Sequence, residues 1–207
     1  MKLAALLSIL ILLSSCKRVA ENQDFNLKSL VKSKENVSET NTDGSNEDFP
    51  SEKITLNAKI IRIVDGDTAE LLYNGELPLI LRLQHIDAPE KRGSQPYGNK
   101  AKIALSDLCF GQQVTILTDG DFDMGGRMIG EIINEEGLNV NKEMVRLGYA
   151  WHFKKYSEDL SYDNLEKEAR NNRRGLWQDS NPIAPWDFRK KKHLILVSRP
   201  LRIFKKY

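Results

Sequence analysis

Five charged residues supply the groups that hydrolysis of a phosphodiester bond needs: a metal site, a base and neutralisation of phosphate charge. Asp67 and Asp87 offer hard carboxylate oxygens, which suit Ca²⁺ or Mg²⁺ rather than zinc. Glu90, just after a proline, can accept a proton from a water molecule held near the metal. Arg82 and Arg127 carry planar guanidinium groups that bind a phosphate in a bidentate manner. Together they form a plausible nuclease site.

Asp67 and Arg82 lie at the two ends of a predicted β-hairpin. Asn74-Gly75 favours a tight turn, because both residues tolerate the positive φ of a type I′ turn. A tight turn there places Asp67 opposite Arg82. The register can also slip by one residue, because Pro78 lacks an N–H and favours a bulge.

The rest of the pattern alternates short strands and helices. Further strands are predicted over Ile54–Val64, Val114–Leu117 and Met128–Ile133. Helices are predicted over 99–111, with Asn99 as N-cap, and over 138–147 and 157–174. We therefore predict an α+β protein, a five-stranded OB-fold Greek-key β-barrel with three packed helices.

Charge is distributed unevenly along the chain. Residues 54–188 contain 16 Lys and Arg against 21 Asp and Glu, whereas residues 189–207 contain eight basic residues and no acidic one. The body therefore cannot attract nucleic acid by its overall charge, and such affinity must come from local basic clusters or from the tail.

The N-terminus is predicted to be processed. Residues 1–15 read as a signal peptide, and Leu13-Ser14-Ser15-Cys16 resembles a bacterial lipobox, which implies lipid attachment to Cys16. The alternative is an ordinary secretory signal with an incidental cysteine. Residues 16–53 are polar and predicted to be a disordered tether. Cys109 is the only other cysteine, so a disulfide framework is excluded.

Three motifs in this order resemble the staphylococcal nuclease (thermonuclease) family. They are DGDT at residues 65–68, RLQHIDAPE at 82–90 and DMGGR at 123–127. The likeness covers about residues 54–180, which we take as the nuclease-like domain, followed by a basic extension at 181–207.

The resemblance implies a role for each candidate residue. It implies that Asp67 and Asp87 bind one calcium ion together with the backbone carbonyl of Ala88, where the founding member has threonine. A carbonyl ligand survives that substitution. Glu90 corresponds to the general base, and the two arginines stabilise the pentacoordinate state. Thr68 either supports the metal shell or simply packs in its strand.

Two departures from the family concern the grip on nucleotides. A Lys-Tyr pair that often holds a terminal phosphate is replaced by Met124 and Gly125. The family's two nucleotide-contacting tyrosines correspond to Lys154 and Tyr156, with Lys155 between them. Aromatic and basic residues in this arrangement can stack a base, worth ~1 to 3 kcal/mol, and neutralise phosphate.

Other charged segments are given plainer interpretations. Asp119, Asp121 and Asp123 are spaced like the start of a calcium loop, but the glycine and the closing glutamate of such a loop are missing, so we expect a solvated acidic hairpin loop. Lys190–Lys192 is either a solvated charge run or a phosphate contact. Leu194–Val197 is either an added strand or a docked tail.

The sequence thus predicts a calcium-dependent enzyme that hydrolyses DNA or RNA with little sequence specificity. It is expected to be monomeric and to act in the cell envelope, outside the cytoplasm, from the lipid on Cys16. The resemblance further implies scission of the 5′ P–O bond. The alternative is a non-catalytic OB-fold module that binds nucleic acid or protein. The complete set of acids and arginines favours the enzyme.

Overall fold

The structure, a computed structural model, describes residues 53–197, with side chains to residue 194. The predicted signal peptide, Cys16 and almost all of the predicted tether lie outside the described residues. No helix within residues 53–197 has the length and hydropathy that a membrane span requires.

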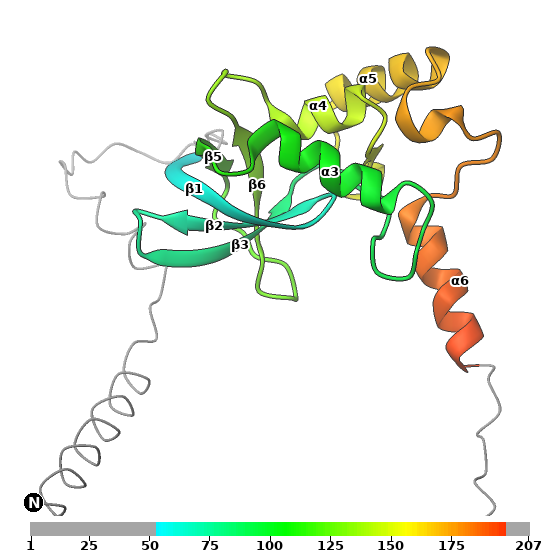
Figure 1. The fold of residues 1–207 in the computed structure, drawn as a ribbon, viewed down its shortest axis with the longest axis horizontal. Helices are drawn as coiled ribbons and strands as arrows, with labels where there is room; N and C mark the ends of the chain where they lie inside the picture. The colour runs from blue at the N-terminus through cyan, green and yellow to red at the C-terminus, as the bar shows by residue number, and fades with distance from the viewer. Residues whose placement is uncertain (1–52, 198–207) are drawn as a thin grey trace, which may run out of the picture. The chain divides into compact units, whose positions relative to one another are not determined.

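Five strands close into a barrel in the order β1-β2-β3-β6-β5 (Figure 1). They are β1 (Ile54–Asp65), β2 (Thr68–Tyr73), β3 (Leu77–Leu83), β5 (Gln113–Thr118) and β6 (Met128–Ile133). β3 and β6 pair in parallel, and the other neighbours are antiparallel. A separate two-stranded sheet joins β4 (Ile86–Asp87) to β7 (Trp151–His152). The predicted five-stranded OB-fold barrel is confirmed.

The β2–β3 hairpin adopts the shifted register. Asn74 and Gly75 have φ of 50° and 77°, as the predicted turn requires. Glu76 then adds one residue to the loop, so Tyr73 pairs with Leu77. The tight register is therefore wrong: Thr68, rather than Asp67, lies opposite Arg82.

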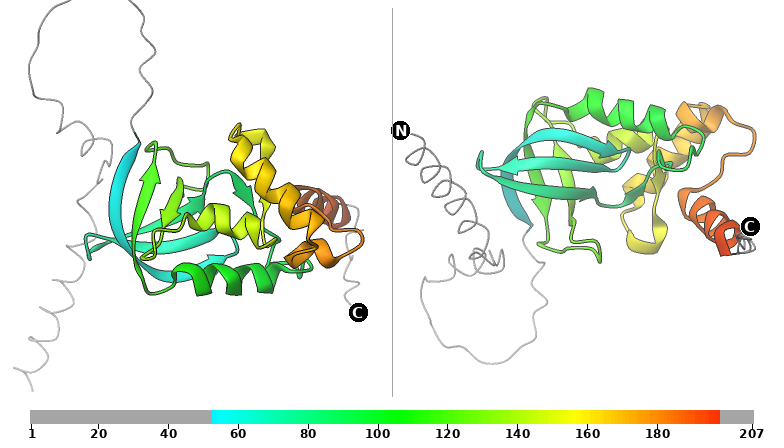
Figure 2. Two further views of the ribbon diagram at one scale, coloured as in Figure 1. Left: turned by 90° about the horizontal axis from the view of Figure 1, so that it is seen from above. Right: turned by 60° about the horizontal axis from the view of Figure 1, so that its bottom comes forward.

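Three helices accompany the barrel, as predicted. They are α3 (Gly98–Cys109), α4 (Val140–Arg146) and α5 (Leu160–Asn171), with short 3-10 helices η1 (Lys154–Tyr156) and η2 (Gly175–Gln178). α3 runs along the barrel in both views of Figure 2. Asn99 does not cap α3: the helix begins at Gly98, after Tyr97 in a left-handed conformation with φ of 68°. Gly98 is required because a Cβ there would lie 2.5 Å from the carbonyl oxygen of Glu90.

One apolar core fills the barrel and extends beneath the helices. Its members include one side chain with no exposed surface from each of the five barrel strands, namely Ile60, Leu71, Leu81, Ile116 and Ile132. Asn141 of α4 is also fully buried and its amide bonds to the backbone of Gly130, Ile132 and Gln84 at 3.0 to 3.1 Å. This side chain fixes α4 to the end of the barrel strands.

A fourth helix, α6 (Pro185–Val197), follows the domain that the motifs cover. Residues 194–197 belong to it, so of the two alternatives for this segment the added strand is wrong. A proline at the first helical position is preorganised for a helix, and the run of lysines that follows also favours one. α6 lies at the end of the barrel opposite to the β2–β3 turn (Figures 1 and 2).

Candidate active site

Arg82 lies between Asp67 and Asp87. Asp67 is in the turn between β1 and β2, Arg82 is near the end of β3, and Asp87 ends β4. The Arg82 guanidinium forms ion pairs with both carboxylates; its Nη2 is 2.9 Å from Oδ1 of Asp87. Asp87 has no exposed surface and Asp67 is 7% exposed. The two predicted metal ligands and one predicted phosphate-binding arginine therefore form a single buried cluster.

Short hydrogen bonds fix the carboxylate of Asp67. Its Oδ2 accepts the backbone N–H of Ala88 at 2.9 Å, and its Oδ1 accepts the hydroxyl of Thr68 at 2.9 Å. The same Thr68 hydroxyl oxygen accepts a bond from Nη1 of Arg127 at 3.3 Å. Thr68 therefore connects the predicted metal ligand Asp67 to Arg127. Of the two roles considered for Thr68, this one is closer to support of the metal site than to plain packing in the strand.

Arg127 reaches the site from the β5–β6 loop and is held there by Asp123. Its Nε donates to Oδ2 of Asp123 at 2.7 Å, and its backbone N–H donates to Oδ1 at 3.0 Å. Partial burial would raise the pKa of Asp123, but the bonds from Arg127 outweigh it and lower this pKa. Asp123 is thus a positioning residue rather than only a solvated loop acid. The hint in the sequence was the two glycines between an acid and an arginine.

Glu90 lies in the loop after β4, whose shape depends on Gln95. The backbone N–H of Glu90 donates to Oε1 of Gln95 at 2.9 Å, and Gln95 is buried. The Glu90 side chain remains 27% exposed. The predicted base is therefore on a fixed backbone, with its carboxylate at the border between protein and solvent.

Arg189 of α6 also enters this cluster, which the sequence did not predict. Its Nη2 is 2.6 Å from Oδ2 of Asp87, and its Nη1 is 2.6 Å from Oε1 of Glu90. Burial opposes the charge of this guanidinium, but the two carboxylates outweigh burial and raise the pKa of Arg189. For Arg82, burial prevails and lowers the pKa despite Asp87.

Comparison with known proteins places the chain in a family. The family model described as Staphylococcal nuclease homologue matches residues 80–179. The chain is 39% identical over 137 residues to a protein named Uncharacterized endonuclease from Escherichia coli O157:H7, which covers 66% of this chain and 87% of that protein. It is 37% identical over 142 residues to Micrococcal nuclease from Shigella flexneri, covering 64% and 79%. The chain belongs to the staphylococcal nuclease family.

Membership makes this protein an enzyme that hydrolyses nucleic acid, as predicted. Nucleases of this family depend on a metal ion in general. The matched range contains Arg82, Asp87, Glu90 and Arg127, whereas Asp67 precedes it and Arg189 follows it.

The donor atoms of this nuclease fit a hard divalent cation. Asp67 and Asp87 supply carboxylate oxygens, and within residues 53–197 no hydrogen bond occupies the carbonyl oxygen of Ala88. The described residues hold no cluster of three or more His, Cys, Asp or Glu side chains that could bind a metal. Because calcium takes six to eight oxygen ligands, such a site leaves positions for water and phosphate oxygens.

The predicted nucleotide contacts line a hollow of about 440 Å³ between β7, η1, α5 and α6. Tyr156 is 65% exposed, and the ammonium of Lys155 lies 4.9 Å from its ring centroid. Lys154 is paired with Asp163 on α5. Met124, at the position where the resemblance implied a weaker grip on a terminal phosphate, is fully exposed. The exposed ring of Tyr156 and the ammonium group of Lys155 therefore lie side by side at this edge, whereas Lys154 is engaged by Asp163.

Proposed function

We propose that this nuclease is a calcium-dependent phosphodiesterase that cleaves DNA and RNA with little sequence specificity. The observation that carries the proposal is the arrangement around Arg82. Two buried carboxylates, a more exposed glutamate and a second arginine from another loop lie around one partly enclosed centre. An ion pair that only stabilises the fold would not need a solvent-accessible glutamate and a second, partly exposed arginine beside two buried carboxylates.

Each side chain of the cluster has a distinct task. Arg127 keeps 36% of its side chain exposed while Asp123 holds its Nε and Nη2 and Thr68 accepts from Nη1, so the second N–H of each terminal nitrogen is left to meet a phosphoryl oxygen. Arg82 neutralises charge from the buried side. Glu90 is the side chain with the access needed to take a proton from an attacking water.

Asp67, Asp87 and the carbonyl of Ala88 would hold the metal. When bound, calcium supplies Lewis-acid polarisation of the phosphoryl group and lowers the pKa of a bound water. We favour calcium because the predicted set includes a backbone carbonyl oxygen beside the carboxylates, a ligand typical of calcium sites, whereas magnesium is usually held by one or two carboxylates together with water and phosphate.

The expected substrate preference follows from the side chains that would contact the nucleic acid. Contacts to phosphate carry no sequence information, and a base stacked on Tyr156 is held by a face that every base possesses. Both features support broad specificity. Lys155 adds a positive charge beside the ring.

We further propose that the enzyme acts as a monomer outside the cytoplasm, in the cell envelope, and is anchored through a lipid on Cys16. The support is the apolar stretch of residues 3–13 followed by Leu-Ser-Ser-Cys at residues 13–16.

The test is to incubate residues 49–207, which form one compact unit, with plasmid DNA and with RNA. Buffers would contain calcium, magnesium or chelator. We expect cleavage of both substrates in calcium and none in chelator. Undiminished cleavage in chelator would refute the metal-dependent mechanism. Binding without cleavage in every buffer would favour the nucleic-acid-binding module.

A further inference from the structure

Arg189 occupies both oxygens of the innermost predicted metal ligand. Nη2 of Arg189 is 2.6 Å from Oδ2 of Asp87, and Nη1 is 3.2 Å from Oδ1. Arg82 shares that Oδ1 at 2.9 Å. The Asp87 side chain has no exposed surface, and among the described residues its hydrogen bonds come from these two guanidinium groups. A cation cannot approach Asp87 from the α6 side while Arg189 is in place.

The same guanidinium also binds the predicted base. Nη1 of Arg189 is 2.6 Å from Oε1 of Glu90. That oxygen of Glu90 is therefore engaged by a charge-assisted hydrogen bond from a residue outside the predicted site. One side chain of α6 therefore contacts two groups with separate tasks.

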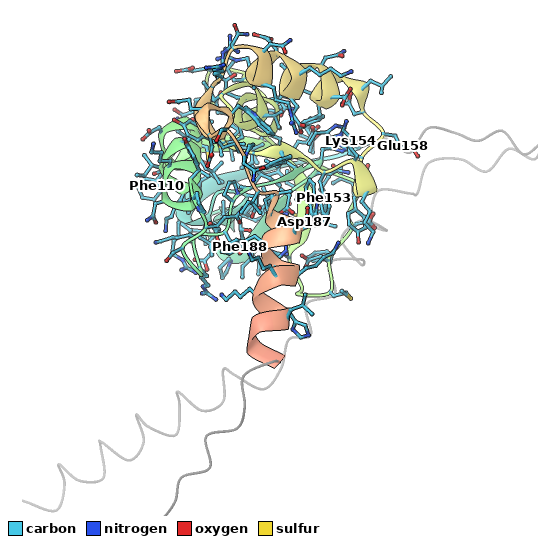
Figure 3. All side chains as sticks on the ribbon, turned by 90° about the vertical axis from the view of Figure 1, so that its right-hand side faces the viewer. Phe110, Phe153, Lys154, Glu158, Asp187 and Phe188 are labelled. Carbon is cyan, nitrogen blue, oxygen red and sulfur yellow. The ribbon has the colours of Figure 1, made fainter. Side chains whose placement is uncertain are left out.

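α6 is held in position by contacts near its beginning. The ring of Trp186 stacks on Phe153 with centroids 5.3 Å apart and an interplanar angle of 6°. Figure 3 shows Phe153 beside the first turn of α6, close to Asp187. The carbonyl of Ile183, just before the helix, accepts a bond from Gln95 at 2.8 Å. These contacts direct Arg189 toward Asp87.

We propose that Arg189 competes with calcium for Asp87 and thereby sets the metal affinity of this nuclease. In this arrangement the guanidinium is a cation attached to the chain, and calcium binding requires it to leave Asp87 and release Glu90. The inference rests on the proposed function in one respect, that Asp67 and Asp87 hold calcium. It concerns a residue outside the range that the family model matches.

The electrostatics favour competition over cooperation. Among the described residues, Asp67, Asp87 and Glu90 form ion pairs with two guanidinium groups, those of Arg82 and Arg189. Removing Arg189 leaves a more negative site that attracts a divalent cation more strongly. Coupling between two binding events is reciprocal. The binding free energy that calcium loses because of Arg189 therefore equals the free energy by which bound calcium weakens the docking of α6.

The experiment measures calcium binding by titration calorimetry on the full chain, purified in detergent, without substrate. Arg189→Gln is compared with the wild type and with Lys191→Gln. Lys191 lies on the same helix, is exposed, and forms no ion pair among the described residues. We expect Arg189→Gln to bind calcium about tenfold more tightly than the wild type. Lys191→Gln should change the affinity less than twofold, because the ammonium group that it removes is exposed to solvent and screened by it.

Thermal unfolding gives an independent readout. In chelator, Arg189→Gln should unfold at a lower temperature than the wild type, because Asp87 loses a partner. Added calcium should raise its unfolding temperature by more than it raises that of the wild type. Arg189→Lys keeps the charge but loses the fork, and should lie between the two in calcium affinity.

Each outcome separates the two proposals. If the wild type binds calcium and Arg189→Gln binds it equally or more weakly, competition is refuted while the calcium site stands. If Lys191→Gln tightens binding as much as Arg189→Gln does, the effect is one of net charge and the assignment to Arg189 is wrong. If no variant binds calcium, the calcium site itself fails and the competition fails with it.

Discussion

Replacing Asp123 by asparagine should uncouple Arg127 from the site while leaving the fold nearly intact. Oδ1 of Asp123 accepts the backbone N–H groups of Gly125 and Arg127 at 2.9 and 3.0 Å, and asparagine retains that oxygen. Oδ2 accepts from Nε of Arg127 at 2.7 Å, and asparagine places an amide donor there instead. The loop keeps its turn, and the guanidinium loses its charged partner while its contact with Thr68 remains.

The expected magnitude follows from what is lost. Asp123→Asn removes a charge-assisted bond, ordinarily worth about 1.5 to 3 kcal/mol, but the pair is partly exposed, so the stability cost should be below about 1 kcal/mol. Arg127→Ala deletes a transition-state contact and should lower kcat by about 10² to 10³. A misplaced guanidinium should cost less than an absent one, so we expect Asp123→Asn to lower kcat by about tenfold to a hundredfold.

The assay is initial-rate cleavage of a fluorescent oligonucleotide in calcium, combined with urea unfolding of the same preparations. Asp121→Asn is the matched control, because it removes the same charge from the same exposed loop without contacting Arg127. Full activity of Asp123→Asn would refute the positioning role. So would a loss of the same size in Asp121→Asn, because that would implicate the field of the loop rather than the bond to Arg127.

Three further predictions concern stability and processing. Asn141→Leu should lower the free energy of unfolding by about 2 kcal/mol or more in urea titrations, because the backbone N–H of Ile132 and the carbonyl of Gln84 lose their amide partner, whereas Asn172→Leu at an exposed site should have little effect. Burial lowers the pKa of His152, so the unfolded chain binds more protons below about pH 6.5. The wild type should therefore lose more stability between pH 7.5 and 5.5 than His152→Gln; equal losses would contradict this assignment. A radiolabelled fatty acid should be incorporated into the wild type and not into Cys16→Ala, and labelling of both would exclude Cys16.

Local chemistry in the sequence predicted the hairpin turn but not its register. Positive φ at Asn74 and Gly75 follows from the two side chains, and this is what the structure has. The added loop residue Glu76 follows instead from how β3 must align with both β2 and β6. Arg82 still pairs with Asp67, because its long side chain reaches the carboxylate from the neighbouring register.

Arg189 could not be found by the same reasoning. It is separated from Asp87 by 102 residues, and its neighbours form a basic run that looks like a solvated helix face. The apolar run at 194–197 was equally uninformative, since four apolar residues fit a strand or one turn of a helix. The stacking of Trp186 on Phe153 and the bond from Gln95 to Ile183 determine which basic residue of α6 enters the site, and neither can be read from local sequence.

The two kinds of charge in the site differ in how firmly they are held. Arg82 is buried with both of its carboxylates, and Asp67 is further tied to the backbone at Ala88, so displacing any member of this group would strand a buried charge. Arg189 is 42% exposed, so it can exchange its carboxylates for water at a much smaller cost. Asp67 and Asp87 are therefore held firmly together with Arg82, whereas the cation contributed by α6 can leave the cluster at a smaller cost to the fold.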